Sequence, residues 1–573
     1  MLKYYLKEVV VVAVFCFAIF TFFLVVHHEM SVKHHAAPKL SLSSFKNIKV
    51  NGGAAKPTNV KIIAAGKNWS ASAISSSSSR DNNASILHDN THNEAEERPG
   101  ILVCNGKRRY SEIIYWKIVP GDNEYESPIT PHHGEHHEKF LTFEYDQGGW
   151  NNVRMSLECM IQIAHAVGRT LVIPPQQHLY LLGEVHKDTE DKSAHDEMGF
   201  EDFFSMDMLR SHRGFHMVEM EDFIEKEACQ GHLNGKLPPK NDSHIWGPKL
   251  WSYLDKAADE NPEWTGKFLA LPDRADRDFN LTDLSPYNDD VKKRMKTFGG
   301  ERVPVFYEKK LQDAYHIHFP ADHQHRLLQH FYAFTFFADK TMQSFYKRFM
   351  RDYMRYKDNI QCAGADLLEA VRADAKKLDP DHNGDFYALH IRRGDFQYKE
   401  VKLSAADILK NLHFPNGKPI IPPGSVVYLS TDDPDGLCTH CFAQRKPCES
   451  YEKGKRPVGC PEDTSWNAFR DFGWKLKFLQ DYTKRGLLKD MNPNLYGMIE
   501  SIVCTRAKAF AGTYHSTFTG YIHRLRGYHG LAESTYYHTN GITFMLQRKN
   551  SIGHGFSREY RSGWIDDDKG GLI

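Results

Sequence analysis

The sequence predicts an α/β protein built on two doubly wound parallel sheets that face a cleft. Short apolar segments alternate with amphipathic helical segments across residues 101–325, and the same alternation returns across residues 326–573. Such alternation is typical of parallel sheets, because neighbouring parallel strands need a helical crossover between them. A third observation, an apolar N-terminal run followed by a polar stretch, predicts that these two domains are tethered to a membrane.

The N-terminus carries the pattern of a single-pass anchor. Residues 9–26 are an apolar run of 18 residues with Thr21 as its one polar side chain, and Lys3 and Lys7 precede it. This length suits a transmembrane helix in a thin membrane, and the lysines predict a cytoplasmic tail over residues 1–8. A cleaved signal peptide is the alternative, although such cores are usually shorter and end at small residues.

A polar stem is expected over residues 27–100. Its sequence, which includes SAISSSSSRDNNAS, cannot bury enough apolar area to offset the entropy cost of folding, so we expect disorder. Four Asn-x-Ser/Thr sequons are consistent with a lumenal chain: Asn68, Asn83, Asn241 and Asn280. We therefore expect a Golgi or endoplasmic reticulum membrane protein whose folded part lies in the lumen.

The charge balance and the cysteines restrict the possible partners. The chain has 73 basic and 73 acidic residues, which argues against an electrostatic grip on nucleic acid. Of ten cysteines, nine lie outside the anchor, so we expect disulfides in an oxidising lumen and at least one thiol left over. Four crowd an insertion at 436–462: Cys438, Cys441, Cys448 and Cys460. Local disulfides are the favoured interpretation there, and a zinc site is the alternative.

In the first domain, residues 140–175 have the pattern of a strand, a loop, a helix and a strand. FLTFEY at 140–145 and LVIPP at 171–175 are short apolar runs. Between them, residues 153–168 carry apolar side chains at helical spacing and end at Gly168, a common helix terminator. This is the βαβ pattern of a parallel sheet.

In the second domain, apolar strands again alternate with helices, and a helical stretch at 326–378 is expected to link the two sheets. The predicted strands are 385–391, 425–430 and 508–514, and the predicted helices are 494–506 and 517–527. Ligands of open α/β sheets bind at the C-terminal ends of the strands, so the cleft between two Rossmann-like domains is the expected site.

Two arginines follow the strand that ends at Ile391, in the stretch ALHIRRGDF. Side chains alternate along a strand, so we expect His390 and Arg392 to point one way and Arg393 the other, where Asp395 is a possible ion-pair partner. A guanidinium at the rim of the sheet suits bidentate binding of phosphate. The alternative is an arginine–aspartate pair that fixes a turn.

Two further stretches end strands of the same predicted sheet. Ser516 and Thr517 begin a helix, whose free backbone N–H groups bind anions, although ordinary capping is the alternative. Asp432, in the stretch STDD, suits a hydrogen bond from a ribose or a base, or an Asx turn. A metal site at Asp433 and Asp435 is the weaker alternative, because the rim arginines already supply positive charge to a diphosphate.

The fourth stretch is GGWNNVRM at 148–155. Its glycines, Gly149 among them, let the backbone approach a ligand closely, and Asn151, Asn152 and Arg154 offer directional polar groups at the start of a helix. The stretch is not G-x-G-x-x-G, so it does not indicate a dinucleotide cofactor. Together the four stretches suggest a diphosphate held by the second domain and a smaller group presented to the first.

Taken in order, these segments resemble the GDP-fucose-dependent O-fucosyltransferase superfamily, which includes protein O-fucosyltransferases and plant O-fucosyltransferase-like proteins. The matching segments, within residues 101–530, are GGWNNVRMSLECMIQIAHAVGRTLVIPP, HIHFPADHQHRLLQHFYAF, ALHIRRGDF, YLSTDD and STFTGYIHRLRG. The resemblance implies a GT-B fold, GDP-fucose as the donor substrate, no cofactor or metal, and inversion at the sugar carbon. The expected acceptor is a hydroxyl group, on a Ser or Thr of a protein.

Carried over by position, the resemblance implies a donor group and an acceptor group of residues. Arg392 resembles the catalytic arginine that contacts the departing phosphate. Further donor contacts are implied for His390, Asp432, Gly149 and the diphosphate loop Ser516, Thr517 and Phe518. Asn151 and Asn152 resemble part of the Gly-rich acceptor-side motif.

The general base departs from the family pattern. Some protein fucosyltransferases have a glutamate where this chain has Gly148. Asp146, which we carry forward as the candidate, or Glu144 is a possible substitute, and proton transfer to the leaving phosphate is a third possibility. The sequence leaves these alternatives open.

Three other functions compete with this interpretation. A fucosyltransferase that modifies a glycan fits the same motifs, and a catalytically silent lumenal binding or scaffold protein fits the missing glutamate. A His-rich metal binder would use HHGEHH at 132–137 and a second set of histidines, His316, His318, His323 and His325. The first of these segments is expected to be a solvated loop.

Overall fold

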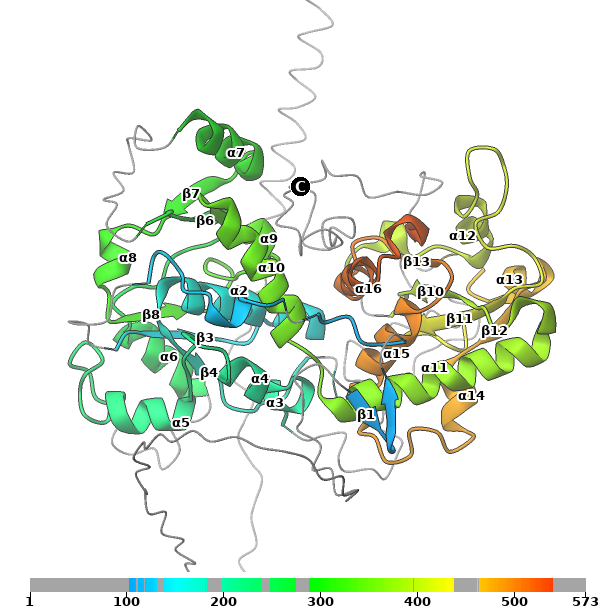
Figure 1. The fold of residues 1–573 in the computed structure, drawn as a ribbon, viewed down its shortest axis with the longest axis horizontal. Coiled ribbons are helices and arrows are strands. Elements are labelled where there is room, and N and C mark those ends of the chain that lie inside the picture. The colour runs from blue at the N-terminus through cyan, green and yellow to red at the C-terminus, as the bar shows by residue number, and fades with distance from the viewer. Residues whose placement is uncertain are drawn as a thin grey trace, which may run out of the picture. The chain divides into compact units, whose positions relative to one another are not determined.

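A computed structural model of the chain (Figure 1) describes residues 102–538, apart from 110–111, 118, 131–137, 181, 183–196, 239–247, 275–287, 395, 437–460 and 462. The predicted tail, anchor and stem lie outside the described residues. The four sequons, the four cysteines of the insertion and the HHGEHH segment lie outside them as well. Within the described ranges, no helix combines the length and the apolar character that crossing a membrane requires.

The first sheet has four parallel strands in the order β5-β4-β3-β8. They are β3 (Phe140–Phe143), β4 (Thr170–Ile173), β5 (Met217–Glu219) and β8 (His316–Phe319). Helix α2 (Trp150–Val167) joins β3 to β4, which confirms the predicted strand–helix–strand unit. The chain places β4 and β5 on one side of β3 and β8 on the other, so the strand order reverses between β3 and β8 (Figure 1).

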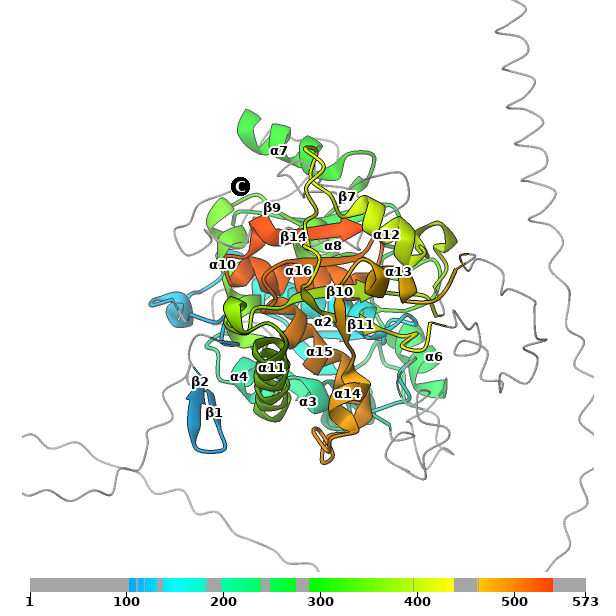
Figure 2. The same ribbon diagram turned by 90° about the vertical axis from the view of Figure 1, so that its right-hand side faces the viewer.

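The second sheet has five parallel strands in the order β12-β11-β10-β13-β14, and Figure 2 labels β11, β10 and β14. They are β10 (Tyr387–Ile391), β11 (Val426–Thr431), β12 (Lys475–Lys477), β13 (Phe510–Thr513) and β14 (Thr535–His538). The three predicted strands are its centre, and the sequence analysis did not find the two edges. Its strand order reverses between β10 and β13, because β11 and β12 lie to one side of β10 and β13 and β14 to the other.

A third parallel sheet was not predicted. It has the order β7-β6-β9, and its strands are β6 (Lys267–Leu271), β7 (Val303–Phe306) and β9 (Thr335–Phe337). Phe268, Phe306 and Phe336 lie in a small core of its own, which α7 (Asp289–Gly299) helps to close. Strand β9, which follows the predicted boundary at 325/326, pairs with β6, which precedes it.

The two faces of the second sheet pack against different helices. Leu389 and Leu429 pack in one core with side chains of α12 (Ala405–Asn411) and α13 (Asn467–Asp471). Ala388 and Tyr428 pack on the opposite face, against α11 (Asp358–Leu378), α15 (Tyr496–Thr505) and α16 (Thr517–Tyr528). His390 follows Ala388 by two residues, so it shares this second face.

The remaining helices complete the layers around the sheets. They are α3 (Phe200–Phe203), α4 (Met206–Arg210), α5 (Met220–Phe223), α6 (Pro248–Ala257), α8 (Lys309–Asp313), α9 (Phe331–Phe334), α10 (Lys340–Tyr353) and α14 (Leu479–Thr483). Two of them, α10 and α11, account for most of the predicted helical stretch at 326–378. The α/β class with parallel sheets is therefore confirmed.

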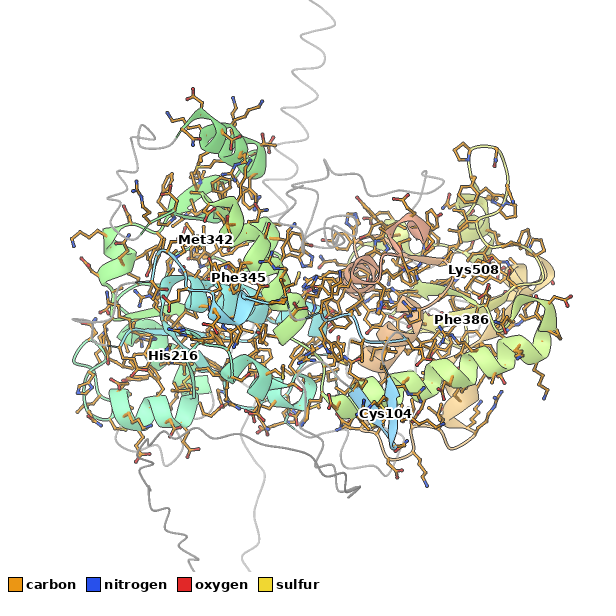
Figure 3. The ribbon with its side chains drawn as sticks, in the orientation of Figure 1. Cys104, His216, Met342, Phe345, Phe386 and Lys508 are labelled. Carbon is orange, nitrogen blue, oxygen red and sulfur yellow. A yellow bond between two sulfur atoms is a disulfide. The ribbon has the colours of Figure 1, made fainter. Side chains whose placement is uncertain are left out.

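One disulfide fixes the start of the described chain. Cys104 ends β1 (Leu102–Cys104), which pairs antiparallel with β2 (Lys107–Arg109), and its sulfur is bonded to Cys362 on α11 (Figure 3). The pairing was not predicted, because the two cysteines are 258 residues apart in the sequence. Among the described residues the free cysteines are Cys159, Cys229 and Cys504.

Candidate functional site

Arg393 leaves the end of β10 toward the protein interior. Its side chain is fully buried, with Nη1 3.6 Å from Asp433 Oδ2 and the guanidinium carbon 3.8 Å from the centre of the Trp466 ring. Burial lowers the pKa of Arg393 to about 10. Among the described residues its carboxylate partner is Asp433, which follows β11; Asp395, which the sequence suggested, lies outside them. Of the two arginines, Arg393 is therefore the one with a structural role, because it joins the end of β10 to Asp433 and Trp466.

Arg392 points the other way and stays at the rim of the sheet. About a fifth of its side chain is exposed, and its Nε lies 3.9 Å from Asp432 Oδ2. Its guanidinium carbon lies 5.0 Å from the centre of the Phe396 ring. The Arg392 backbone N–H donates to Thr513 Oγ1 over 2.9 Å, which ties it to β13. The predicted alternation is confirmed, and it places a guanidinium at the point where the strand order reverses.

The start of α16 adjoins this arginine. Strand β13 ends at Thr513, and a turn with His515 at a φ of 65° leads to Ser516, the N-cap residue. No described side chain caps the first turn of α16, and Ser516 Oγ is buried without a hydrogen-bond partner among the described residues. Exposed N–H groups at a helix start attract anions. An unpaired hydroxyl beside them adds a further donor.

His390 joins β10 to the first turn of α16. Its Nδ1 lies 2.7 Å from Thr519 Oγ1, and its ring centre lies 4.7 Å from that of Phe518. Burial lowers the pKa of His390 well below its usual value, so the imidazole is neutral at physiological pH. Gly512 on β13 allows this close approach, since a Cβ there would collide with the Thr519 side chain. His390 and Phe518 therefore form one wall of polar and aromatic groups.

Asp432 shapes the turn that follows β10. Its Oδ1 accepts the Arg393 backbone N–H over 2.8 Å, and its Oδ2 accepts the Gly394 N–H over 3.0 Å. These bonds give Asp432, which follows β11, a structural role. They hold the backbone of the turn that carries the rim arginine. A direct contact between Asp432 and a nucleotide stays a prediction.

Glu500 is a site residue that the sequence analysis missed. It lies on α15, partly exposed, and its Oε1 accepts a hydrogen bond of 2.9 Å from the Tyr428 hydroxyl. Burial raises the pKa of Glu500 to about 7, although hydrogen bonds from Tyr428 and Ser430 oppose the rise. Ser430 is the register partner of His390, so the carboxyl group lies beside that wall. A lone Glu within the apolar helix NLYGMIESIVCTR was the available signal.

The Gly-rich loop of the first domain is held by an ion pair. Asp146 is buried, and its two oxygens accept from Arg326 Nε and Nη2 over 2.7 and 2.8 Å. Asp146 Oδ1 also accepts the Gly148 N–H over 2.7 Å. A Cβ on Gly148 would collide with the Asn152 amide and lie 2.8 Å from Asp146 Oδ1. A side chain at position 148 would therefore require the Asn152 amide to move.

The other predicted residues of this loop lie at the start of α2. Gly149 is the N-cap residue, and Asn151 is buried with its Oδ1 accepting from Arg154 Nε over 3.1 Å. Asn152 is half-buried, and its side-chain amide lies against Gly148. Gly149, Asn151 and Asn152 are therefore brought together with Asp146 in one loop.

A buried ion network joins the helices that begin at the two loops. Glu158 on α2 accepts from Arg154 over 2.6 Å and from two nitrogens of Arg524 on α16 over 2.7 and 2.8 Å. All three side chains are buried, and the Arg154 guanidinium carbon lies 3.8 Å from the centre of the Tyr521 ring. Charge pairs this deep are rigid, so the two helices keep a fixed relation.

The second set of predicted metal-binding histidines lies on β8 and in the turn that follows it. His316 and His318 are buried on β8, and His325 pairs with Asp322 at 2.9 Å in the following turn. Within the ranges that the structure covers, no group of three or more His, Cys, Asp or Glu side chains could hold a metal ion.

Comparisons with known proteins were made for the sequence and the fold. The family model described as GDP-fucose protein O-fucosyltransferase matches residues 140–458, which is more than half of the chain. No curated protein matches the sequence.

Similar solved structures include two fucosyltransferases. POFUT1 in complex with GDP-fucose is 12% identical, with 70% of this chain and 99% of that chain covered and a TM-score of 0.31. The NodZ α-1,6-fucosyltransferase co-crystallised with GDP is 14% identical, with 68% and 93% covered and a TM-score of 0.29. The fucosyltransferase NodZ from Bradyrhizobium is 14% identical, with 68% and 94% covered and a TM-score of 0.29.

Proposed function

The chain belongs to the GDP-fucose protein O-fucosyltransferase family, and from this premise we propose that it transfers fucose from GDP-fucose to a hydroxyl group, on a Ser or Thr of a protein. One observation carries the proposal. Arg392 and the start of α16 meet where the strand order of the second sheet reverses, between β10 and β13. In open α/β sheets, ligands bind at the carboxyl ends of the strands at such a reversal.

The pyrophosphate of the donor would bind between Arg392 and the first turn of α16. The guanidinium offers two parallel N–H groups, and the helix start adds backbone N–H groups and the Ser516 hydroxyl. As the bond from the sugar to the phosphate lengthens, negative charge builds on the departing GDP. Donors fixed in advance stabilise that charge by about 3 kcal/mol each. The reaction inverts the sugar carbon and needs no metal ion.

The guanine base would lie against His390, Phe518 and Glu500. An ionised carboxylate accepts two N–H groups at once, which matches the paired N1–H and N2–H2 donors of guanine. Uracil offers a single ring N–H, and adenine offers only its amino group. Glu500 therefore supports selection of a guanine nucleotide, and the partly exposed Phe518 ring offers a surface for stacking.

The acceptor would approach from the loop at Gly149, Asn151 and Asn152. The Glu158–Arg524 ion pair supports this assignment, because it binds the helix that follows this loop to the helix that begins at the donor site. We assign the two sheets to the two halves of a GT-B-like transferase. The apolar run at 9–26 supports a membrane anchor that holds the enzyme in the Golgi or endoplasmic reticulum lumen.

Thermal unfolding of the full chain in detergent, with GDP, UDP or ADP, tests the donor site. A nucleotide at 100 times its dissociation constant adds about 2.7 kcal/mol of stability, so GDP alone is expected to raise the Tm clearly. Release of GDP and fucose from GDP-fucose then separates an enzyme from a silent binding protein. Equal stabilisation by all three nucleotides would contradict the proposed guanine contacts.

A further inference from the structure

A small pocket lies at the strand-order reversal of the first sheet. Its walls include Glu144, which follows β3, Phe319 at the end of β8, Ser156 of α2, and Arg326. These are the carboxyl ends of β3 and β8, where the order β5-β4-β3-β8 reverses. The position is equivalent to that of Arg392 on the second sheet, so the same physical rule predicts a ligand here.

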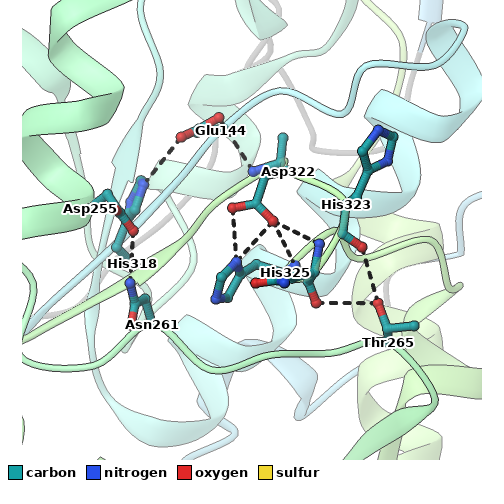
Figure 4. Close-up of polar contacts among 10 residues, drawn as sticks. Glu144, Asp255, Asn261, Thr265, His318, Asp322, His323 and His325 are labelled. Carbon is teal, nitrogen blue, oxygen red and sulfur yellow. Dashed lines mark hydrogen bonds and ion pairs between the residues drawn. The ribbon is translucent and has the colours of Figure 1, made fainter. Parts of the chain in front are cut away.

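Two carboxylates line this pocket, and their surroundings differ. Asp146 accepts three hydrogen bonds, two from Arg326 and one from the Gly148 N–H. Glu144 is held weakly: its Oε2 accepts the Ala321 N–H over 3.3 Å, and its Oε1 lies 3.5 Å from His318 Nε2 (Figure 4). About a fifth of the Glu144 side chain is exposed. Glu144 is therefore the carboxylate that can take up a further partner.

A buried chain of polar groups stands behind Glu144. His318 Nδ1 and His316 Nε2 each lie 2.7 Å from Thr142 Oγ1, and all three side chains are fully buried. One hydroxyl donates one hydrogen, so Thr142 donates to one ring and accepts from the other. If it donates to His318 Nδ1, the His318 hydrogen lies on Nε2 and faces the carboxylate. The opposite direction would aim a lone pair at Glu144, so the first arrangement is favoured.

We propose that Glu144 is the general base that deprotonates the acceptor hydroxyl, with His318 as the residue that positions it. The proposal rests on the proposed function and names the base for it. The Glu144 carboxylate takes the hydroxyl proton while the acceptor oxygen bonds to the sugar carbon. The bond from that carbon to the β-phosphate oxygen breaks, and its electron pair leaves on GDP. The proton stays on Glu144 until it passes to solvent.

The pocket is linked to the donor site by contacts already described. Ser156, in the pocket wall, and Glu158 both lie on α2, and Glu158 holds Arg524 of α16. Helix α16 begins at Ser516 in the donor loop. One buried ion pair therefore joins α2, which forms one wall of this pocket, to the helix that begins at the donor loop.

Hydrolysis of GDP-fucose by the full chain tests the base, because water then takes the place of the acceptor. Loss of a general base costs 10²–10⁴-fold, so Glu144→Gln is expected to slow hydrolysis by about 100-fold or more while GDP still raises the Tm. Azide needs no deprotonation, so azide is expected to restore GDP release in Glu144→Gln and to yield a fucosyl azide. Azide should not rescue Arg392→Lys, whose defect lies in the leaving group.

The role of His318 as the positioning residue is tested by comparing the turnover of two His318 variants. Glutamine places an N–H where His318 Nε2–H lies, so His318→Gln should keep more of the turnover than His318→Ala, with the KM for GDP-fucose unchanged in both. If Glu144→Gln hydrolyses GDP-fucose at the wild-type rate, the proposal is overturned. The proposal is also overturned if Glu144→Gln binds GDP but azide does not increase its release of GDP from GDP-fucose. A wild-type chain that GDP does not stabilise would instead refute the proposed function itself.

Discussion

Replacing Glu500 with glutamine is expected to make the ligand-free protein more stable and its nucleotide binding worse. Glu500 is half-buried and accepts a hydrogen bond from the Tyr428 hydroxyl, and desolvation of its carboxyl group raises its pKa from 4.5 to about 7. Each pKa unit corresponds to about 1.4 kcal/mol, so ionising Glu500 costs the folded protein up to about 3 kcal/mol. Glutamine has nearly the same shape, still accepts from the Tyr428 hydroxyl, and never ionises.

The sign of the pH dependence follows from the direction of this shift. Because the pKa is raised on folding, the folded chain holds a proton that the unfolded chain loses between pH 4.5 and about 7. The contribution of Glu500 to stability is thus fully present below pH 4.5 and is lost as the pH rises through 7. Glu500→Gln and the wild type should differ little at pH 4.5, and the variant should be more stable by up to about 3 kcal/mol at pH 8.

Urea unfolding of both proteins at pH 5 and pH 8 measures this difference, with and without GDP. Glu301→Gln is the matched control, because Glu301 is exposed. At pH 8, GDP should stabilise the wild type strongly and the variant little, since the amide presents N–H groups to the N–H groups of guanine. A stability gap that is the same at both pH values would refute the buried carboxylate. Equal stabilisation by GDP would refute its contact with the base.

Three further outcomes follow from the site. Arg392→Lys should reduce GDP-fucose turnover by about 100-fold, because an ammonium cannot reproduce the two-pronged contact; near-wild-type turnover would contradict its role. Turnover should persist in excess EDTA, and its abolition would favour a metal-dependent mechanism. Glu158→Ala leaves Arg524 without its carboxylate and should cost about 3–5 kcal/mol in urea unfolding; a loss below 1 kcal/mol would show that the ion pair is not what joins α2 and α16.

The elements with strong hydrophobic patterns could be predicted from the sequence. Strands β10, β11 and β13 are buried on both faces, and continuous apolar runs mark such strands. The edge strand β12 has only three residues, KLK, and two of them are charged. Its sequence therefore could not be distinguished from that of a loop. The third sheet was missed because β6, β7 and β9 are short and far apart in the chain.

The site was predictable where local geometry decides it. The opposite directions of Arg392 and Arg393 follow from strand alternation alone. The ion pair between Arg393 and Asp433 did not follow, because Asp433 comes after β11 and lies near Arg393 only once β11 pairs with β10. Glu500 was missed for the same reason. Its carboxyl group contacts the Tyr428 hydroxyl only when α15 packs on the sheet, and the two residues are far apart in the sequence.

The two strand-order reversals divide the chemistry into a cationic half and an anionic half. The second sheet presents a guanidinium and a helix start, which suit stabilisation of the charge on a leaving diphosphate. The first sheet presents a weakly held carboxylate backed by the His318 imidazole, which suits removal of a proton. Joined directly, an arginine and a glutamate would neutralise each other in an ion pair. Separate sheets, fixed by the Glu158–Arg524 contact, keep both groups available to the substrates.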